Sequence, residues 1–339
     1  MNKIKKLWND HKIWFIIGVL ILLSLISTFC YFYSDIALNF KKDNPNGEFF
    51  KVILSILGGI GLFYGLWINS QRIKAQNKQN KLVEDRNQDQ KSYDADKRFG
   101  EAIGYLGSDK TSIILGGIYA LYQLAKEDKR YKPIIAGLFT SYLQDKSEQL
   151  YELSDKESAE QTEPRKLNKV PIIVRTIVDL LFNTENVFNA VKLNLSSVLF
   201  KHIIFNNDVR NCNFDFSEFQ NCNFNSNIIN CSFEITEISS CRFGNKESKI
   251  LQCEFWGSNI KDITFSGDRM NSVNFDLVSF NKSSFKISHL IKCNFQAATF
   301  INKAELSDVD SFAGTKFNKE SKDILNFKNC KNRDEIEYT

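Results

Sequence analysis

The 339-residue chain has little of what most catalytic and metal-binding proteins use. Its three histidines, His11, His202 and His289, lie far apart in the sequence and form no local cluster of metal ligands. No two of the eight cysteines form a C-x-x-C pair, which argues against zinc and redox motifs. A glycine-rich phosphate loop, a nucleophile elbow and a paired-carboxylate motif are also missing. We therefore expect a protein that is not an enzyme and holds neither a metal nor another cofactor.

The chain also lacks a strong charge of either sign. It has 44 basic and 40 acidic residues, a net charge of +4, so the total creates no strong field for nucleic acid or anionic lipid. Its length leaves room for two or three structural units.

Two long apolar runs lie near the N-terminus, at residues 13–33 and 49–68. The first contains no charge and the second contains only Lys51. At about 1.5 Å per residue, each can cross a hydrocarbon core of roughly 30 Å. The first run lacks a small-x-small cleavage site and is soon followed by the second, which favours two transmembrane helices over a cleaved signal peptide.

Basic residues flank the two runs on the sides away from the connecting segment 34–48. They are Lys3, Lys5, Lys6 and Lys12 before the first run, and Arg72, Lys74, Lys78 and Lys81 after the second. Because basic flanks stay in the cytoplasm, we expect the basic N-terminus 1–12 and the C-terminus inside and segment 34–48 outside. The turn motif Asn44-Pro45-Asn46-Gly47 fits a helical hairpin. This pattern predicts a multi-pass protein of the cell inner membrane.

The second run carries Gly58, Gly61 and Gly65 along one helical face. Small residues let helix backbones approach closely in lipid. Two interpretations remain open: the glycines pack the hairpin onto itself, or they hold a homo-oligomer together.

Residues 69–97 are polar, and the lack of proline and glycine from 71 to 97 predicts a helical stalk that continues the second span. Apolar spacing of helical period over residues 98–190 predicts a small all-α domain. Its helices are separated by Gly107-Ser108-Asp109, and others begin at Pro133 and Pro171. The charged stretch 144–169 is expected to be a mobile loop.

Within residues 191–316 an apolar residue returns at every fifth position. A period of five fits neither a helix nor a flat strand, but it fits a solenoid whose coils have four sides of five residues. One residue is missing before Ile228, and two are inserted before Ile250. The predicted inward residues are Leu199, Ile204, Val209, Phe214, Phe219, Phe224, Ile228, Phe233, Ile238, Phe243, Ile250, Phe255, Ile260, Phe265, Met270, Phe275, Phe280, Phe285, Leu290, Phe295 and Phe300.

Every fourth inward residue should share one side of the solenoid, and the sequence segregates accordingly. One predicted column is Phe214, Phe233, Phe255, Phe275 and Phe295, the opposite one includes Phe224, Phe243, Phe265 and Phe285, and a column without aromatics between them is Val209, Ile228, Ile250, Met270 and Leu290. Six cysteines lie two positions before the phenylalanines of the two phenylalanine columns, and in one coil Val273 occupies this position instead of a cysteine. This exchange favours a packing role for the thiols over redox sensing or metal binding.

Several segments resemble the pentapeptide-repeat family, whose loose motif is A-(D/N)-L-x-x with Cys and Phe variants. They are Cys222-Asn-Phe224, Cys231-Ser-Phe233, Cys293-Asn-Phe295 and Ala298-Thr-Phe300. Upstream, Arg98-Phe99-Gly100 through Leu115-Gly-Gly-Ile-Tyr-Ala-Leu121 is similar to the helical segment of membrane-anchored bacterial members. The resemblance implies a right-handed quadrilateral β-helix after a two-span α-helical membrane hairpin and a small all-α domain.

The repeat predicts about five coils, roughly 25 Å long. The unpaired edges at the ends of a solenoid need covers. We expect the helix before Leu199 to cap one end and the C-terminal tail, residues 317–339, to cap the other.

The leading functional interpretation is a membrane-anchored, non-catalytic interaction or scaffold module with a protein partner of unknown identity. Outward residues that follow inward ones are its candidate partner-binding residues: Ile229, Leu251 and Ile291 beside the column without aromatics, and Trp256 on the next face. The alternative at this surface is that the chain's own tail covers these side chains.

Two other functions are weighed against this one. A membrane-perturbing effector of a bacterial defence or toxin-like system, triggered through the cytoplasmic domain, would use the two spans. They lack charged or polar pore-lining residues, which argues against a channel. Some members of the pentapeptide-repeat family, which this chain resembles, mimic DNA and bind a topoisomerase. Residues 199–300 contain ten basic and ten acidic residues, so a neutral solenoid argues against this mimicry and against nucleic acid as a partner.

Overall fold

The computed structural model describes residues 18–19, 23–24, 26–27, 45–159, 170–185, 187–302 and 304–339. The chain divides into two compact units, residues 1–90 and 91–339. Most of the predicted first span, 13–33, and of the connection 34–48 lies outside the described residues, as does the basic N-terminus 1–12.

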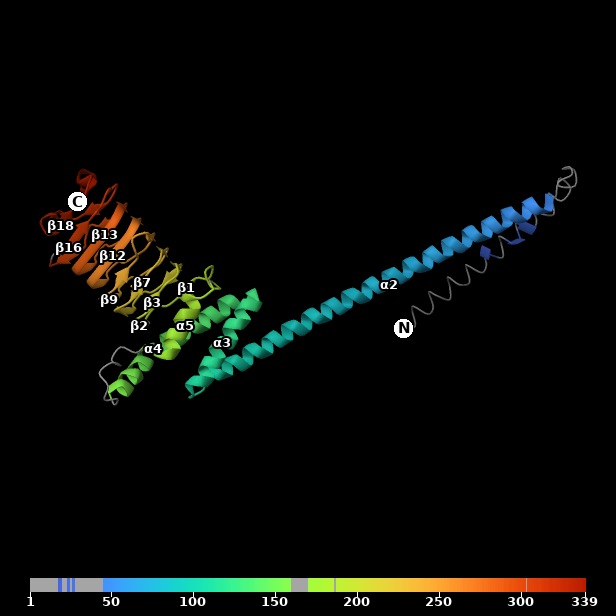
Figure 1. The fold of residues 1–339 in the computed structure, drawn as a ribbon, viewed down its shortest axis with the longest axis horizontal. Coiled ribbons are helices and arrows are strands. Elements are labelled where there is room, and N and C mark those ends of the chain that lie inside the picture. Colours follow the sequence, from blue (N-terminus) through green and yellow to red (C-terminus); the bar gives the residue numbers. More distant parts are fainter. Residues whose placement is uncertain are drawn as a thin grey trace. The chain divides into compact units, whose positions relative to one another are not determined.

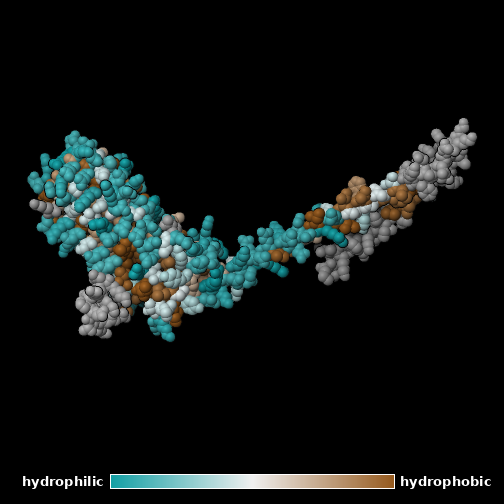
Figure 2. Space-filling view, viewed as in Figure 1, coloured by the Kyte–Doolittle hydropathy of each residue, from teal (hydrophilic) through white to brown (hydrophobic). Residues whose placement is uncertain are grey.

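Helix α2 (Pro45–Leu106) is 62 residues long and joins the second apolar run to the polar stalk without a break. The predicted turn Asn44-Pro45-Asn46-Gly47 is wrong from its second residue onward, because α2 begins at Pro45. Proline suits the first turn of a helix, where its missing N–H has no partner to lose. By length and composition, α2 is the one helix in the described part of the chain that can cross a membrane. Figure 2 shows hydrophobic residues along its early part and hydrophilic residues beyond.

The second unit opens with the end of α2 and four further helical elements. They are α3 (Thr111–Glu127), the 3-10 turn η1 (Lys129–Tyr131), α4 (Lys132–Ala159) and α5 (Ile172–Val178), which continues as the π-helical η2 (Asp179–Asn183). The predicted break at Gly107-Ser108-Asp109 is confirmed. Gly117 of α3 lies against α2 so closely that a Cβ there would be 2.8 Å from the Ala102 carbonyl oxygen. Ile118, Phe139 and Ile177 fill the helical core.

The predicted mobile loop at 144–169 is wrong over residues 144–159, which form the second half of α4. The helix is stabilised by contacts with a segment about fifty residues further along the chain. Ser147 Oγ accepts a hydrogen bond from the Leu199 N–H at 3.2 Å, and Tyr151 Oη is 3.0 Å from both the N–H and the carbonyl oxygen of Lys201. These tertiary bonds explain why a charged, locally irregular sequence continues as a helix.

From Leu193 onward the chain forms a β-solenoid of parallel strands (Figure 1). The strands are β1 (Leu193–Asn194), β2 (Leu199–Lys201), β3 (Ile204–Phe205), β4 (Val209–Arg210), β5 (Cys212–Asn213), β6 (Glu218–Gln220), β7 (Asn223–Phe224), β8 (Ile228–Ile229), β9 (Glu237–Ser239), β10 (Arg242–Phe243), β11 (Lys249–Leu251), β12 (Asn259–Asn271), β13 (Ser279–Ile291), β14 (Asn294–Phe295), β15 (Thr299–Ile301), β16 (Ala304–Ser307), β17 (Lys316–Phe317), β18 (Leu325–Lys328) and β19 (Glu337–Tyr338). Every strand pairs in parallel with the strand one coil away.

The parallel registers confirm the three predicted columns. Ile228 pairs with Ile250, and Phe243 pairs with Phe224 and Phe265. The phase of the first two inward residues was predicted wrongly. Phe200 and Phe205 are buried, whereas Leu199 is half-buried and Ile204 is exposed. Another residue is therefore missing between Phe205 and Val209, so the first coil has the same short side as the second.

The solenoid is longer than the predicted five coils. One ladder has eight rungs, at Asn194, Asn213, Ser232, Glu254, Asn274, Asn294, Lys316 and Glu337, and eight rungs make seven turns. At about 4.8 Å per turn the length is about 34 Å. The five-residue period did not predict the extra coils, because the buried residues Phe300, Leu306 and Phe312 are six residues apart. The prediction that residues 317–339 cap the end of the solenoid is wrong, because these residues extend the ladders: β18 pairs with β16, and β19 pairs with β17.

Helical elements cap the first coil, as predicted. Phe182 of η2 places its ring edge-on to Phe205, with 5.2 Å between ring centroids, and closes the open end of the core. The Asn183 amide donates to the Ile204 carbonyl oxygen and accepts from the Asn206 N–H, both at 2.7 Å. Asn183 therefore takes the place of a neighbouring strand and satisfies backbone groups that an open edge would leave unpaired.

Candidate interaction surfaces of the solenoid

The interior of the solenoid is filled by phenylalanine rings. Within a column the rings stack: Phe233 and Phe255 lie 4.7 Å apart with planes 4° apart. Across the core, rings from opposite sides meet edge to face, as Phe255 and Phe265 do at 5.8 Å and 90°. Both geometries are the favourable ones for aromatic pairs. The packed interior leaves the outer surface as the place where the solenoid can bind other molecules.

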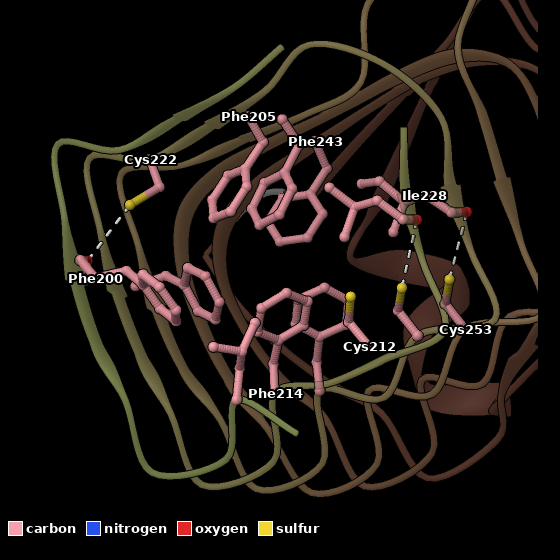
Figure 3. Close-up of a cluster of buried hydrophobic side chains, with 14 of the residues drawn as sticks. Phe200, Phe205, Cys212, Phe214, Cys222, Ile228, Phe243 and Cys253 are labelled. Atoms are coloured by element: carbon pink, nitrogen blue, oxygen red, sulfur yellow. Dashed lines mark hydrogen bonds between the residues drawn. The ribbon is translucent and has the colours of Figure 1, made fainter. Parts of the chain in front are cut away.

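The cysteines of the core take part in this packing. The described cysteines are free thiols, and those of the two phenylalanine columns are buried. The Cys222 thiol donates to the Phe200 carbonyl oxygen one coil back at 3.4 Å (Figure 3). The Ser217 hydroxyl makes the same contact with the Leu195 carbonyl oxygen at 2.8 Å. Burial raises the pKa of Cys293 to about 12. A protonated, hydrogen-bonded thiol of this kind is inert, which supports the predicted packing role for Cys293.

The four predicted partner-binding residues lie in two different columns. Ile229, Leu251 and Ile291 share one parallel ladder and are half-buried. Arg210 and Asn271 occupy the other rungs of that ladder. Trp256 lies on the next side of the coil and is 38% exposed. The alternative that the tail covers these side chains does not hold for the described residues, because β18 and β19 continue the ladders.

Most residues with positive φ in the described part of the solenoid lie at its corners and form three columns, one residue per coil. The first is Ser197, Phe216, Ile235, Gly257 and Leu277; the second is His202, Asn221, Ser240, Asp262, Lys282 and Asn302; the third is Asn211, Asn230, Gln252, Ser272, Lys292 and Gly314. The second and third columns are polar or glycine throughout. The first carries large apolar side chains: Phe216 is 61% exposed, Ile235 47% and Leu277 53%.

We call Phe216, Ile235 and Leu277 the corner ridge. The corner ridge was not predicted from the sequence, although a signal exists: each member lies two positions after an inward phenylalanine of one column. Gly257 occupies the same position in the coil between Ile235 and Leu277, and Trp256 precedes it.

The charges of the neutral solenoid are sorted onto different sides. The columns that flank the corner ridge contain six of the ten carboxylates between residues 199 and 300 and none of the ten basic residues. These carboxylates are Asp215, Glu218, Glu234, Glu237, Glu254 and Asp276. Partial burial and the negative charges of Asp215 and Glu254 raise the pKa of Glu234. An acidic strip therefore accompanies the apolar ridge.

No group of three or more His, Cys, Asp or Glu side chains within the described ranges is placed to hold a metal ion. The acidic strip is spread along the solenoid, one or two carboxylates per coil, and does not converge on a point. Its geometry suits an extended partner better than a small ligand.

The sequence matches no protein-family profile, and no curated protein is similar to it. Among solved structures, two trypsin-treated forms of QnrB1, a plasmid-mediated fluoroquinolone resistance protein, are similar to part of the chain. The match to one of them has 14% sequence identity and a TM-score of 0.21, and it covers 44% of this chain and 76% of the QnrB1 chain. The match to the other has 16% sequence identity and a TM-score of 0.18, and it covers 38% of this chain and 76% of the QnrB1 chain. Likenesses this weak carry no argument; the β-solenoid is established by its own parallel ladders, and membership of the pentapeptide-repeat family stays a prediction.

Proposed function

We propose that this protein is a non-catalytic protein-interaction module, anchored in a membrane, that presents a β-solenoid to the cytoplasm. The observation that carries the proposal is the solenoid's core, which is filled from side to side by stacked rings while apolar side chains remain on the outside. A rigid solenoid with a packed interior can act only through its surface. Rows of exposed apolar residues on such a surface are typical of protein-binding sites.

Membrane anchoring is supported by α2. Its early part is apolar, and Leu62, Phe63 and Leu66 expose their side chains fully enough to face lipid. We propose that α2 and residues 13–33 form two spans with both termini in the cytoplasm. Reporter fusions within residues 34–44 and after Thr339 should then report opposite sides of the membrane, and the same side for both would refute the hairpin.

The partner-binding role is tested by a double variant, Leu251→Ser with Trp256→Gln. Because neither side chain belongs to the inner core, we expect the thermal unfolding temperature to stay unchanged. Recovery of proteins that co-purify with the wild-type chain should fall sharply, since a few large side chains dominate such interfaces. Unchanged recovery at unchanged stability would remove both residues from the interface.

A growth assay separates this function from a membrane-perturbing effector. Expression of the full chain should be harmless if the spans are only an anchor. Toxicity that disappears when residues 13–68 are deleted would favour the effector.

A further inference from the structure

We propose that the corner ridge and its acidic strip form a docking site for a basic, amphipathic helix of a partner protein. This inference rests on the proposed interaction function and identifies the surface and the chemistry of the partner. It uses a different row of residues from the ladder of Ile229, Leu251 and Ile291.

The backbone conformation of the ridge is the first argument. A left-handed backbone is strained for an ordinary residue, whereas glycine and asparagine adopt it readily. Of the eighteen non-glycine residues with positive φ in the described chain, only Phe216, Ile235 and Leu277 are apolar, and all three share one column. Isoleucine is especially unfavourable there because its Cβ is branched. Folding alone therefore favours other residues at these positions, which indicates that the apolar side chains serve another purpose.

The exposure and spacing of the ridge are the second argument. Its side chains project from a corner, the most accessible part of a coil, and Trp256 lies beside them. Neighbouring coils are about 4.8 Å apart, close to the roughly 5.4 Å rise per turn of an α-helix. A helix parallel to the solenoid axis can thus set one apolar residue per turn against each coil from Phe216 to Leu277.

The charge of the acidic strip indicates which kind of partner can bind to the corner ridge. Asp215 and Glu234 lie on one flank of the ridge and Glu218 and Glu237 on the other, with no basic residue in these columns. Hydrogen bonds from Ser232 Oγ and from the Glu234 N–H hold the Asp215 carboxylate in place. A second copy of the same surface or an anionic lipid surface would be repelled. A helix with lysine or arginine on both sides of an apolar stripe is complementary in charge and in shape.

The test uses the full chain in phosphatidylcholine nanodiscs and a fluorescently labelled leucine–lysine peptide of about 18 residues, five helical turns. The peptide carries leucine at i, i+3, i+4 and i+7 and lysine elsewhere. A matched peptide carries glutamate in place of lysine. Anisotropy should show saturable binding of the lysine peptide that weakens as salt is added, and no binding of the glutamate peptide.

The decisive variant is Phe216→Asn with Ile235→Asn and Leu277→Asn. Asparagine suits the left-handed backbone, so we expect an unfolding temperature equal to or above that of the wild type. Peptide binding should fall at least about tenfold, because the apolar anchors are lost. The control variant, Ile229→Asn with Leu251→Asn and Ile291→Asn, should leave peptide binding unchanged.

A second variant tests the charges without altering the corner backbone. Glu218→Gln with Glu237→Gln should weaken binding of the lysine peptide and flatten its salt dependence. Wild-type affinity in the ridge variant, or equal binding of the two peptides, would overturn the inference. If the ridge variant binds normally while the Leu251 and Trp256 double variant loses its cellular partner, the ridge is excluded and the interaction module stands. If neither variant loses any binding, both proposals fail.

Discussion

Replacement of Phe255 by alanine tests the packing of the solenoid core most directly. The side chain is fully buried. Its ring is stacked between Phe233 at 4.7 Å and Phe275 at 5.0 Å, and it meets the ring edges of Phe243 at 5.7 Å and Phe265 at 5.8 Å. Truncation therefore removes contacts with rings on the coils before and after and on the opposite side.

The cavity left by this truncation has little freedom to collapse. The spacing of the coils is set by ladder bonds, such as those from the Phe255 N–H to the Asn274 carbonyl oxygen at 2.8 Å and from the Phe233 N–H to Glu254 at 2.7 Å. Buried Phe→Ala changes cost about 3–5 kcal/mol, and we expect the upper part of that range here. This is a large share of the roughly 5–15 kcal/mol that stabilises a typical domain. Phe255→Asp, which adds an unpaired buried charge, should unfold the solenoid altogether.

Urea unfolding followed by circular dichroism measures the loss, with protease resistance as an independent readout. Phe216→Ala is the matched control: the chemical change is the same, but the ring is 61% exposed, so stability should shift by no more than about 0.5 kcal/mol. Wild-type urea midpoints for Phe255→Ala, or wild-type protease resistance for Phe255→Asp, would refute the inward assignment of this column.

Three further predictions concern stability and reactivity. Ser283 buries a hydroxyl that has no hydrogen-bond partner, so Ser283→Ala should stabilise the protein by about 1 kcal/mol in the same urea assay. Ser258→Ala removes a hydrogen bond to the Phe233 carbonyl oxygen and should destabilise the protein by a similar amount. The Cys293 thiol should resist iodoacetamide in the native protein and react only on unfolding, because burial raises its pKa to about 12; rapid native alkylation, read by mass spectrometry, would contradict this. The raised pKa of Glu234 means that its ionised form is disfavoured in the fold, so Glu234→Gln should raise the melting temperature at neutral pH, and the gain should disappear as the pH falls below the usual carboxyl range. A gain that persists in acid would show that charge is not its cause.

The sequence predicted the arrangement of the core well because burial repeats along the chain. In a solenoid each coil packs only against its neighbours, so the inward positions recur at a short interval that can be read locally. Phe214, Phe233 and Phe255 could therefore be assigned to one column from the sequence alone. The interval changes before Val209 and after Phe300. The period of five therefore assigned Leu199 and Ile204 to the interior wrongly and did not predict the last two coils.

The features that sequence reasoning missed depend on contacts between distant segments. Residues 144–159 are helical because Ser147 and Tyr151 bond to the first coil, and no local pattern records that bond. The corner ridge depends on backbone conformation, since a positive φ decides that Phe216 projects from a corner.

The sequence by itself thus determined the period, the columns and the apolar character of the core, because these follow from which side chains avoid water at each fifth position. Only the tertiary structure decided how the surface is organised. The ten acidic and ten basic residues between positions 199 and 300 sum to zero, yet coiling brings six of the carboxylates, among them Glu218 and Glu237, to the flanks of one apolar ridge. Charges about twenty residues apart in sequence become neighbours because one turn of the solenoid places them side by side, and that proximity is a property of the coil rather than of the composition.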